Sequence, residues 1–507
     1  MVILNNNYTF RSMTDIKKPI LLVILDGFGY RAELAHNAIT PQTAPFFFHL
    51  WNNYPHTLLP AAGKAVGLPD GYIGNSEVGH LTIGTGQLIK QPLTQLQDAI
   101  ADKTFFTNPL LLEKLAALAE SKKTVHIMGL VSDAGVHGHI DHMIALIQAA
   151  QSAGVHNIII HPFLDGRDVA RHSAADFLEQ LEPYLNANTV IGSIHGRFYA
   201  MDRDKNWERT QKSYDVLTSP QEIRFINWQQ ALDYYYPQLL SEEFIPPTQL
   251  IENAYIQPGD AVICTNFRPE RIVQLIASLM QTPFTGFDRT YIPIAWCITP
   301  VEYAPDIATL ALLSPPKINT CLKQELAKLN KTIFTSAETE KWAHVTYFFD
   351  AYRRLPFSGE TRVLIPSIKA QTYINYPCMS APEITTAIIT SLQNDMHDFY
   401  LINYANADMV GHSGDFEAAQ KAITCLDEQV KKLYETAVQK YNGTLIITAD
   451  HGNAEQMVDK DGNSKTSHTT NEVPFVAVNN QKNNYALPAT LADITEFILQ
   501  LFTEFTN

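Results

Sequence analysis

The chain has 507 residues and a formal net charge of −15, and 46% of its residues are hydrophobic while 18% are charged. This composition is typical of a globular protein, and the length predicts two or three domains rather than one core. The acidic balance argues against general nucleic-acid binding, which needs Lys and Arg to neutralise phosphates, and no apolar run approaches the roughly 20 residues of a membrane helix.

Residues 1–18 precede the first apolar run and contain no apolar signal core before Lys17 and Lys18. We interpret them as a disordered leader. The cysteines are scattered and form no CxxC pair; they are Cys264, Cys297, Cys321, Cys378 and Cys425. Five free thiols and a cytoplasmic location are therefore expected.

Three short apolar runs each lead to an acidic residue. The runs are 19–25, 398–404 and 443–449, and the acidic residues that follow them are Asp26, Asp408 and Asp450. Continuous apolar runs of this length are typical of parallel strands buried on both faces. Ligands of open α/β sheets bind beyond the carboxyl ends of the strands, so the three runs predict one shared site.

A glycine-rich stretch, Gly74–His80, surrounds Ser76 and is followed by Gly84-Thr85-Gly86. Glycines let the backbone turn sharply and approach a ligand closely, as an exposed nucleophile or a phosphate cradle requires. An ordinary structural turn is the alternative, because glycine and asparagine are common in loops.

The middle of the chain has its own alternation, with a strand at 124–130, a helix at 140–153 and a strand at 157–163. A charged amphipathic stretch at 113–123 predicts a surface helix. The segments 86–92 and 313–316 have the composition of linkers. We therefore predict an α/β fold in which residues 19–90 and 314–507 form one discontinuous domain and residues 91–313 form an inserted α/β domain.

Several candidate metal ligands lie at or near the predicted strand ends. Asp408 and His412 are four residues apart, which brings side chains together on one helical turn, and Asp450 is adjacent to His451. With Asp26 and His468 they form a set of carboxylates and imidazoles that suits Mn²⁺ or Zn²⁺. Ser76 can complete one coordination sphere as an alkoxide, since a divalent cation lowers the cost of deprotonating a hydroxyl.

The inserted domain carries arginines in motif-like loops, namely Arg167, Arg197, Arg203, Arg268 and Arg271. Converging guanidinium groups would bind a small dianion or trianion bidentately. Two alternatives stay open. The arginines can instead form ion pairs with Asp165, Asp168, Asp202 and Asp204, and the histidines His137, His139 and His142 can form a second metal site.

As a set, these motifs resemble the cofactor-independent phosphoglycerate mutases of the alkaline phosphatase superfamily, which need no bisphosphoglycerate. The resemblance runs from about Pro19 to the C-terminal region through LLVILDGFG, GNSEVGH, SDAGVHGH, LDGRD, GRFYAMDRD, NFRPER, EKWAHVTYFF, NADMVGHSG, TADHGNAE and TSHTTNEVP. It implies an alkaline-phosphatase-like metal domain interrupted by a substrate-binding phosphotransferase domain. It also implies a monomer that acts on a small molecule, with no nucleic-acid or membrane partner.

The resemblance assigns roles residue by residue. It implies two Mn²⁺ ions, one held by Asp408, His412 and His468 and the other by Asp26, Ser76, Asp450 and His451. Ser76 would be the nucleophile that is phosphorylated, Lys341 would bridge the phosphoryl group, and Asp168 would shuttle the protons of the glycerate hydroxyls. The implied substrate-binding residues are His137, Arg167, Asp168, Arg197, Arg203, Arg268, Arg271 and Lys341.

The expected function is the glycolytic and gluconeogenic interconversion of 3-phosphoglycerate and 2-phosphoglycerate through a phosphoserine. The alternative is another metal-dependent phosphatase or phosphomutase of the same superfamily, which would share the metal ligands and differ in the inserted domain.

Overall fold

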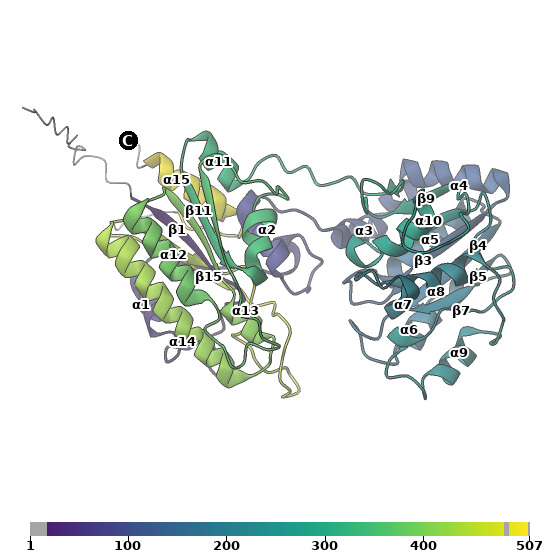
Figure 1. Ribbon diagram of the computed structural model, residues 1–507, viewed down its shortest axis with the longest axis horizontal. Coiled ribbons are helices and arrows are strands. Elements are labelled where there is room, and N and C mark those ends of the chain that lie inside the picture. The colour runs from purple at the N-terminus through teal and green to yellow at the C-terminus, as the bar shows by residue number, and fades with distance from the viewer. Residues whose placement is uncertain (1–17, 481–485, 505–507) are drawn as a thin grey trace, which may run out of the picture. The chain divides into compact units, whose positions relative to one another are not determined.

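The computed structural model describes residues 18–480 and 486–504. Within it the chain divides into two units (Figure 1). The first unit runs to Lys90 and resumes at Pro316, and the second is Gln91–Pro315. The predicted leader, residues 1–18, lies outside the described residues except for Lys18.

A seven-stranded sheet forms the centre of the first unit among the described residues. In spatial order its strands are β12 (Glu360–Ile365), β11 (Ile333–Glu338), β13 (Phe399–Tyr404), β1 (Ile20–Leu25), β14 (Thr444–Thr448), β15 (Val473–Val478) and β2 (His56–Leu59). β1 pairs in parallel with β13 on one side and β14 on the other, while β15 pairs antiparallel with both of its neighbours, β14 and β2. The three predicted strands are therefore confirmed and are neighbours.

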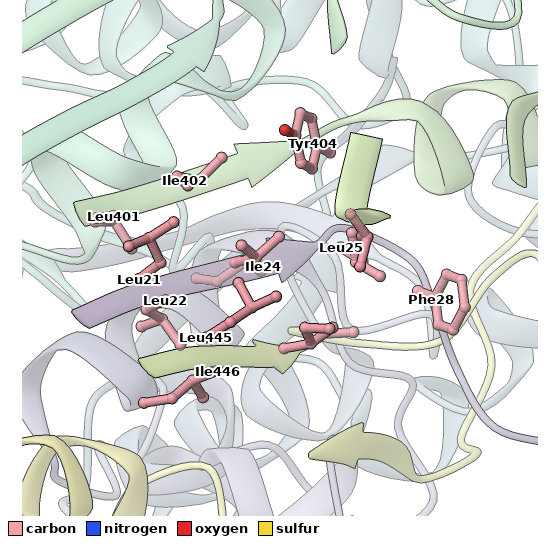
Figure 2. Close-up of a cluster of buried hydrophobic side chains, with 14 of the residues drawn as sticks. Leu21, Leu22, Ile24, Leu25, Phe28, Leu401, Ile402, Tyr404, Leu445 and Ile446 are labelled. Carbon is pink, nitrogen blue, oxygen red and sulfur yellow. The ribbon is translucent and has the colours of Figure 1, made fainter. Parts of the chain in front are cut away.

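The apolar character of these strands follows from their place in the sheet. Every residue of β1, β13 and β14 is buried, as parallel strands covered on both faces must be. Figure 2 shows the side chains of β1, including Leu22 and Ile24, lying between those of β13 and β14.

Helices of the first unit form two packed groups that cover the sheet (Figure 1). One group is α1 (Pro45–Asn53), α12 (Ala381–Asn394) and α14 (Phe416–Leu433), and the other is α2 (Ser76–Thr85), α11 (Leu322–Lys328) and α15 (Asp493–Glu504). The short helix α13 (Asn406–Gly411) follows β13 directly. Further helical turns are η1 (Gly63–Val66), η6 (Thr339–Lys341) and the π-helices η7 (His344–Phe348) and η8 (Tyr434–Lys440).

The second unit has its own largely parallel sheet. Its strands are β10 (Leu310–Ala311), β9 (Trp296–Thr299), β8 (Ala261–Cys264), β3 (Thr124–Val131), β4 (Asn157–Leu164), β6 (Ser193–Gly196) and β7 (Thr248–Gln249) in spatial order, with β5 (Thr189–Ile191) paired to β4. Its helices are α3 (Pro92–Ala101), α4 (Pro109–Ser121), α5 (Ile140–Ser152), α6 (Ala174–Glu179), α7 (Arg197–Ala200), α8 (Trp207–Thr218), α9 (Trp228–Tyr235) and α10 (Val273–Met280). Its 3-10 turns are η2 (Thr104–Thr107), η3 (Glu182–Tyr184), η4 (Glu242–Phe244) and η5 (Pro269–Arg271).

The predicted strand, helix and strand in the middle of the chain are β3, α5 and β4, and the two strands pair in parallel. The predicted surface helix at 113–123 is α4, which starts earlier because Asn108 caps it by accepting a hydrogen bond from Leu111 N at 3.1 Å. Among the described helices, none has the length and apolar content needed to traverse a lipid bilayer.

The prediction of five free thiols is wrong. Cys378 and Cys425 form a disulfide that joins the turn before α12 to the middle of α14, with a Cα–Cα distance of 5.6 Å. Cys264, Cys297 and Cys321 are free and buried. The two paired cysteines are separated by 47 residues, so their proximity depends on packing that spacing alone does not reveal.

Candidate active site

The carboxyl ends of β1, β13 and β14 meet at one edge of the first sheet. Leu25 pairs with Tyr404 and Ile24 with Thr448, so the residues that follow these strands leave the sheet together. Asp26 and Asp450 come directly after β1 and near the end of β14, and Asp408 lies on α13; all three are at most 2% exposed. Buried carboxylates gathered in this way require cations.

Ser76 is the first residue of α2 and is buried beside this carboxylate cluster. The side chain of Asn75 caps the helix by accepting a hydrogen bond from Val78 N at 3.1 Å. A Cβ atom at Gly79 would lie 2.5 Å from the carbonyl oxygen of Asp450, so glycine is what permits α2 to approach the strand end. Ser76 Oγ donates to Asp26 Oδ1 at 3.1 Å and lies 3.0 Å from His451 Nε2.

His412 and His468 present the same ring nitrogen to Asp408. Nδ1 of His412 lies 2.7 Å from the carbonyl oxygen of Thr466, and Nδ1 of His468 lies 2.8 Å from that of Gly74. Each carbonyl accepts a hydrogen bond from Nδ1–H, which leaves the Nε2 lone pairs facing Asp408 Oδ1 at 3.2 and 3.0 Å. The two Nε2 atoms are 3.0 Å apart. Three converging lone pairs with tautomers fixed by backbone carbonyls are the arrangement of a metal site.

Three groups of side chains have ligand atoms within 4.8 Å of one another in the described chain. They are Asp408, His412 and His468; Asp26, Asp408 and His451; and Asp26, His80 and Asp450. Asp408 belongs to two groups and Asp26 to two. All six ligand candidates other than Ser76 thus gather at the sheet edge, as the strand ends predict.

His80 and Asn403 lie in this site, although the sequence did not single them out. His80 Nδ1 lies 2.9 Å from the carbonyl oxygen of Ser76, and Asn403 Nδ2 lies 3.0 Å from His80 Nε2 and donates to Asp26 Oδ2 at 2.8 Å. Asn403 therefore orients Asp26 and His80 together. The available signals were the place of His80 in GNSEVGH and the place of Asn403, a polar residue near the end of the buried strand β13.

Lys341, at the end of η6, supplies the central positive charge. Its Nζ lies 2.7 Å from Asp26 Oδ1, 2.7 Å from Ser76 Oγ and 2.6 Å from Asp408 Oδ2. Burial opposes the charged ammonium, but Asp26 and Asp408 outweigh it and raise the pKa of Lys341. The reciprocal effect holds at the acids: burial would raise the pKa of Asp26 and Asp408, whereas Lys341 lowers both well below the usual range.

The carboxylates at this edge of the sheet also favour a positive charge on His451. Burial lowers the pKa of its imidazole, but Asp450 and then Asp26 overcome burial and raise the pKa to about 9. Because the surrounding carboxylates favour positive charge, the ring sits where a divalent cation would be stabilised as well.

The second unit holds a separate cluster of guanidinium groups. Arg197 is buried and its Nη1 donates to Asp165 Oδ1 and Asp168 Oδ2, each at 2.5 Å. Arg167 Nε lies 3.0 Å from Glu243 Oε2. Ion pairing with aspartate therefore holds for Arg197, while Arg167 uses a glutamate that the sequence did not indicate.

The pKa of Arg271 is lowered by the positive charge of this cluster as well as by burial. Burial lowers its pKa first, and the neighbouring Arg203, Arg197 and Arg167 lower it further, with Asp168 acting in the opposite sense. Guanidinium groups close enough to depress the pKa of an arginine carry an excess of positive charge that an anion would neutralise. Arg268 flanks the same turn, η5, and its charge acts on Glu270.

His137 lies beside this cluster, with its Nδ1 3.2 Å from Glu270 Oε1. Within the described residues, no candidate metal group contains His137, His139 or His142, so the structure does not bring them together as ligands. His139 Nδ1 instead accepts a hydrogen bond from Asp141 N at 3.2 Å and caps α5.

Taken together, the two α/β units and the sheet-edge cluster around Ser76 are those of an enzyme whose candidate site can hold metal ions. Residues 96–305 match the family described as BPG-independent PGAM N-terminus (iPGM_N). The chain belongs to the family of 2,3-bisphosphoglycerate-independent phosphoglycerate mutases, which are isomerases of glycolysis. The predicted family and the predicted fold class, an alkaline-phosphatase-like domain with a second α/β domain, are confirmed.

Individual relatives support this membership over nearly the whole chain. The 2,3-bisphosphoglycerate-independent phosphoglycerate mutase of Microcystis aeruginosa is 42% identical over 91% of this chain and 86% of its own length. The enzyme of the same name from Pseudomonas fluorescens is 42% identical over 96% of this chain and 97% of its own. A crystal structure of Leishmania mexicana phosphoglycerate mutase at low cobalt concentration matches this chain with a TM-score of 0.71 and 30% sequence identity. The match covers 97% of this chain and 96% of the other.

Proposed function

We propose that this enzyme interconverts 3-phosphoglycerate and 2-phosphoglycerate through a phosphoserine at Ser76, with two divalent metal ions that we expect to be Mn²⁺. One observation carries the proposal. Ser76 Oγ lies within 3.1 Å of an ammonium, a carboxylate and an imidazole at an edge where further ligand atoms converge. A hydroxyl in such surroundings is built to be ionised and to receive a phosphoryl group.

The residues present fit two metal ions. Asp408, His412 and His468 would hold one, because their lone pairs already face one another. Asp26, Ser76, Asp450 and His451 would hold the other. Asp450 Oδ1 accepts from the backbone N–H groups of Gly27 and His451 at 3.3 and 3.1 Å, whereas its buried Oδ2 accepts no hydrogen bond in the described chain and lies 3.1 Å from His80 Nδ1. A buried carboxylate oxygen that accepts no hydrogen bond is suited to bind a cation.

Divalent ions at these positions would lower the cost of ionising a hydroxyl and stabilise charge on phosphoryl oxygens. In the proposed reaction Ser76 Oγ attacks phosphorus in line, the bond from phosphorus to the substrate's O3 breaks, and Lys341 stabilises the transferring oxygens. The glycerate O2 then attacks the phosphoserine and regenerates Ser76.

The second unit is assigned substrate binding. The guanidinium groups of Arg167, Arg197, Arg203, Arg268 and Arg271, together with His137, would bind the anionic substrate. Asp168 would return a proton to O3 as the phosphoryl group departs and remove one from O2 before the phosphoryl group returns. The Arg197 guanidinium, 2.5 Å from Asp168 Oδ2, would hold that carboxylate in place.

The test is a coupled enolase assay with 3-phosphoglycerate and without bisphosphoglycerate. We expect activity that disappears after EDTA treatment, returns with Mn²⁺, and is absent from Ser76→Ala. The Ser76→Ala protein should keep the unfolding transitions of the wild type, since a hydroxyl is all that is removed. Activity that survives complete metal removal, or substantial turnover by Ser76→Ala, would refute the proposal.

A phosphatase or another phosphomutase of the superfamily is the competing function. Labelled glycerate added during turnover separates them, because a mutase that retains its intermediate does not exchange it freely. We further propose that the enzyme is a cytoplasmic monomer whose partners are its small-molecule substrates, in keeping with the glycolytic reaction for which its relatives are named.

A further inference from the structure

The segment Ser241–Ile245, which includes η4, contacts both loops that carry the proposed anion-binding residues of the second unit. It lies outside every motif that the sequence indicated. Ser241 and Glu242 are fully buried, and the Glu243 side chain is 11% exposed. Buried polar side chains in a short loop segment need a structural or functional reason.

Ser241 and Glu242 fix the loop 165–174. Ser241 Oγ donates to the carbonyl oxygen of Gly166 at 2.9 Å. The Glu242 carboxylate accepts from the backbone N–H groups of residues 172, 173 and 174 at 2.6, 2.8 and 3.1 Å. Gly166 has a φ of +63°, and a Cβ atom there would lie 2.2 Å from Ser241 Oγ. The loop that carries Arg167 and Asp168 is thus held at both of its ends.

Glu243 acts on Arg167 directly. Its Oε2 lies 3.0 Å from Arg167 Nε, while the Arg167 side chain is 50% exposed. A guanidinium has five N–H donors in a rigid fork, and an Nε contact leaves the four N–H bonds of the Nη atoms for bidentate binding of a carboxylate or phosphate. Glu243 therefore sets the plane of the fork.

The same segment holds the second loop. Gly196 N donates to the carbonyl oxygen of Ile245 at 2.9 Å, and a Cβ atom at Gly196 would lie 2.4 Å from the carbonyl oxygen of Glu243. The rings of Phe198 and Phe244 pack with centroids 5.2 Å apart. Arg197 lies between these two contacts, so its position depends on η4.

We propose that Ser241, Glu242 and Glu243 are positioning residues for substrate recognition, and that Glu243 orients the Arg167 guanidinium toward the anionic group of phosphoglycerate. This inference rests on the proposed function. In this proposal a segment with no substrate contact of its own determines how tightly the arginine cluster binds phosphoglycerate.

Glu243 provides the sharpest test, because its carboxylate makes a single ion pair and its removal is expected to leave the fold intact. We expect Glu243→Ala to raise KM for 3-phosphoglycerate by about tenfold, the effect of losing one charge-assisted hydrogen bond, with kcat within about twofold. Glu243→Gln should give a smaller rise, since its amide oxygen can still accept from Arg167. Glu222→Ala, which removes an exposed glutamate paired with Arg224, is the matched control and should leave KM unchanged.

A double-mutant cycle with Arg167→Ala distinguishes orientation from general loosening. If Glu243 acts through Arg167, the double variant will have the KM of Arg167→Ala alone. An unchanged KM in Glu243→Ala, or effects that add, would overturn the inference while leaving the mutase function intact. Absence of mutase activity in the unmodified enzyme would instead refute the function. Thermal unfolding of each variant checks the fold, and if the alanine variant unfolds, Glu243→Gln supplies the same cycle.

Discussion

His142 is a buried imidazole whose ring nitrogens make no hydrogen bond with the described residues. It lies on α5, is 2% exposed, and neither ring nitrogen has a hydrogen-bond partner in the described part of the chain. Burial first, and the neighbouring His139 second, lower its pKa from the ordinary 6.5 to about 3. The ring is therefore neutral in the folded protein and becomes protonated below pH 6.5 only when the chain unfolds.

This residue predicts acid sensitivity with a defined sign. Because the unfolded state binds more protons between pH 6.5 and about 3, the free energy of unfolding falls as the pH decreases through that window. At pH 5 the loss from this one group is about 2 kcal/mol. We expect His142→Leu to lessen the difference in urea midpoint between pH 7.5 and pH 5. The exposed His156 gives the control, His156→Leu, and an equal pH dependence in the wild type and His142→Leu would contradict the prediction.

Four charged side chains, Lys323, Asp350, Glu360 and Arg362, connect elements of the first unit. Lys323 Nζ on α11 lies 3.0 Å from Asp350 Oδ1 and 2.8 Å from Glu360 Oε1, and it donates to the carbonyl oxygen of Val345 in η7 at 2.7 Å. Arg362 Nη2 lies 2.7 Å from Asp350 Oδ2. Lys323, Asp350 and Glu360 side chains are fully buried. The network thus joins α11 and β12 to the π-helix that follows Lys341.

Removal of the lysine should be costly at this element. Lys323→Met leaves two buried carboxylates with only Arg362 as a cation, and breaking a buried ion pair in this way costs about 3–5 kcal/mol. Lys328→Met, in the same helix, removes a side chain that is 58% exposed and should change stability by less than about 1 kcal/mol. Urea denaturation of the two variants provides the measurement. Equal effects of the two substitutions would show that the Lys323 network has no special importance.

The sequence predicted elements whose evidence is local and missed those that depend on distant partners. β1, β13 and β14 are continuous apolar runs, and the acidic residues after them gather at one edge because parallel strands end together. Ser241 to Glu243 have no such pattern. Their proposed role rests on contacts with residues far earlier in the chain, such as the hydrogen bond from Ser241 to Gly166, which are 75 positions apart. A single sequence does not show such pairs.

At the scale of the whole molecule, the two units have separate hydrophobic cores. The larger core is built around β1, β13 and β14, and one core of the second unit includes Met128, Phe163 and Val262. Each core is formed by one unit, so the proposed ligands should stabilise different parts of the chain. Metal ions would act on the first unit and phosphoglycerate on the second.

Calorimetry can detect this division. We expect two unfolding transitions, of which Mn²⁺ raises one and, in metal-free protein, 3-phosphoglycerate raises the other. At a hundredfold excess over Kd a ligand adds about 2.7 kcal/mol, or a shift of roughly 5 to 10 °C for units of this size. Asp408→Asn should reduce the Mn²⁺ shift and leave the 3-phosphoglycerate shift unchanged. A single transition raised by either ligand would contradict independent unfolding of the cores.

The Cys378–Cys425 disulfide has a consequence for two of the candidate metal ligands. It closes a covalent ring across a sequence separation of 47 residues that contains β13 and α13, and therefore Asp408 and His412. Asn406 Nδ2, at the start of α13, donates to the carbonyl oxygen of Pro377 at 2.8 Å, next to Cys378. The cross-link thus lies one residue from the contact that holds the helix.

Such a ring restricts the conformational entropy of the unfolded chain, by about 4 kcal/mol for a loop of this length in the chain-entropy model. We expect the Cys378→Ser/Cys425→Ser variant to unfold at a lower urea concentration than the oxidised protein, and dithiol treatment of the wild type to reproduce the change. Identical midpoints would contradict this. Since Cys378 is exposed, thiols in solution can reach the disulfide and reduce it. When the bond is reduced, a larger share of the metal-binding free energy would go into ordering the ligands themselves.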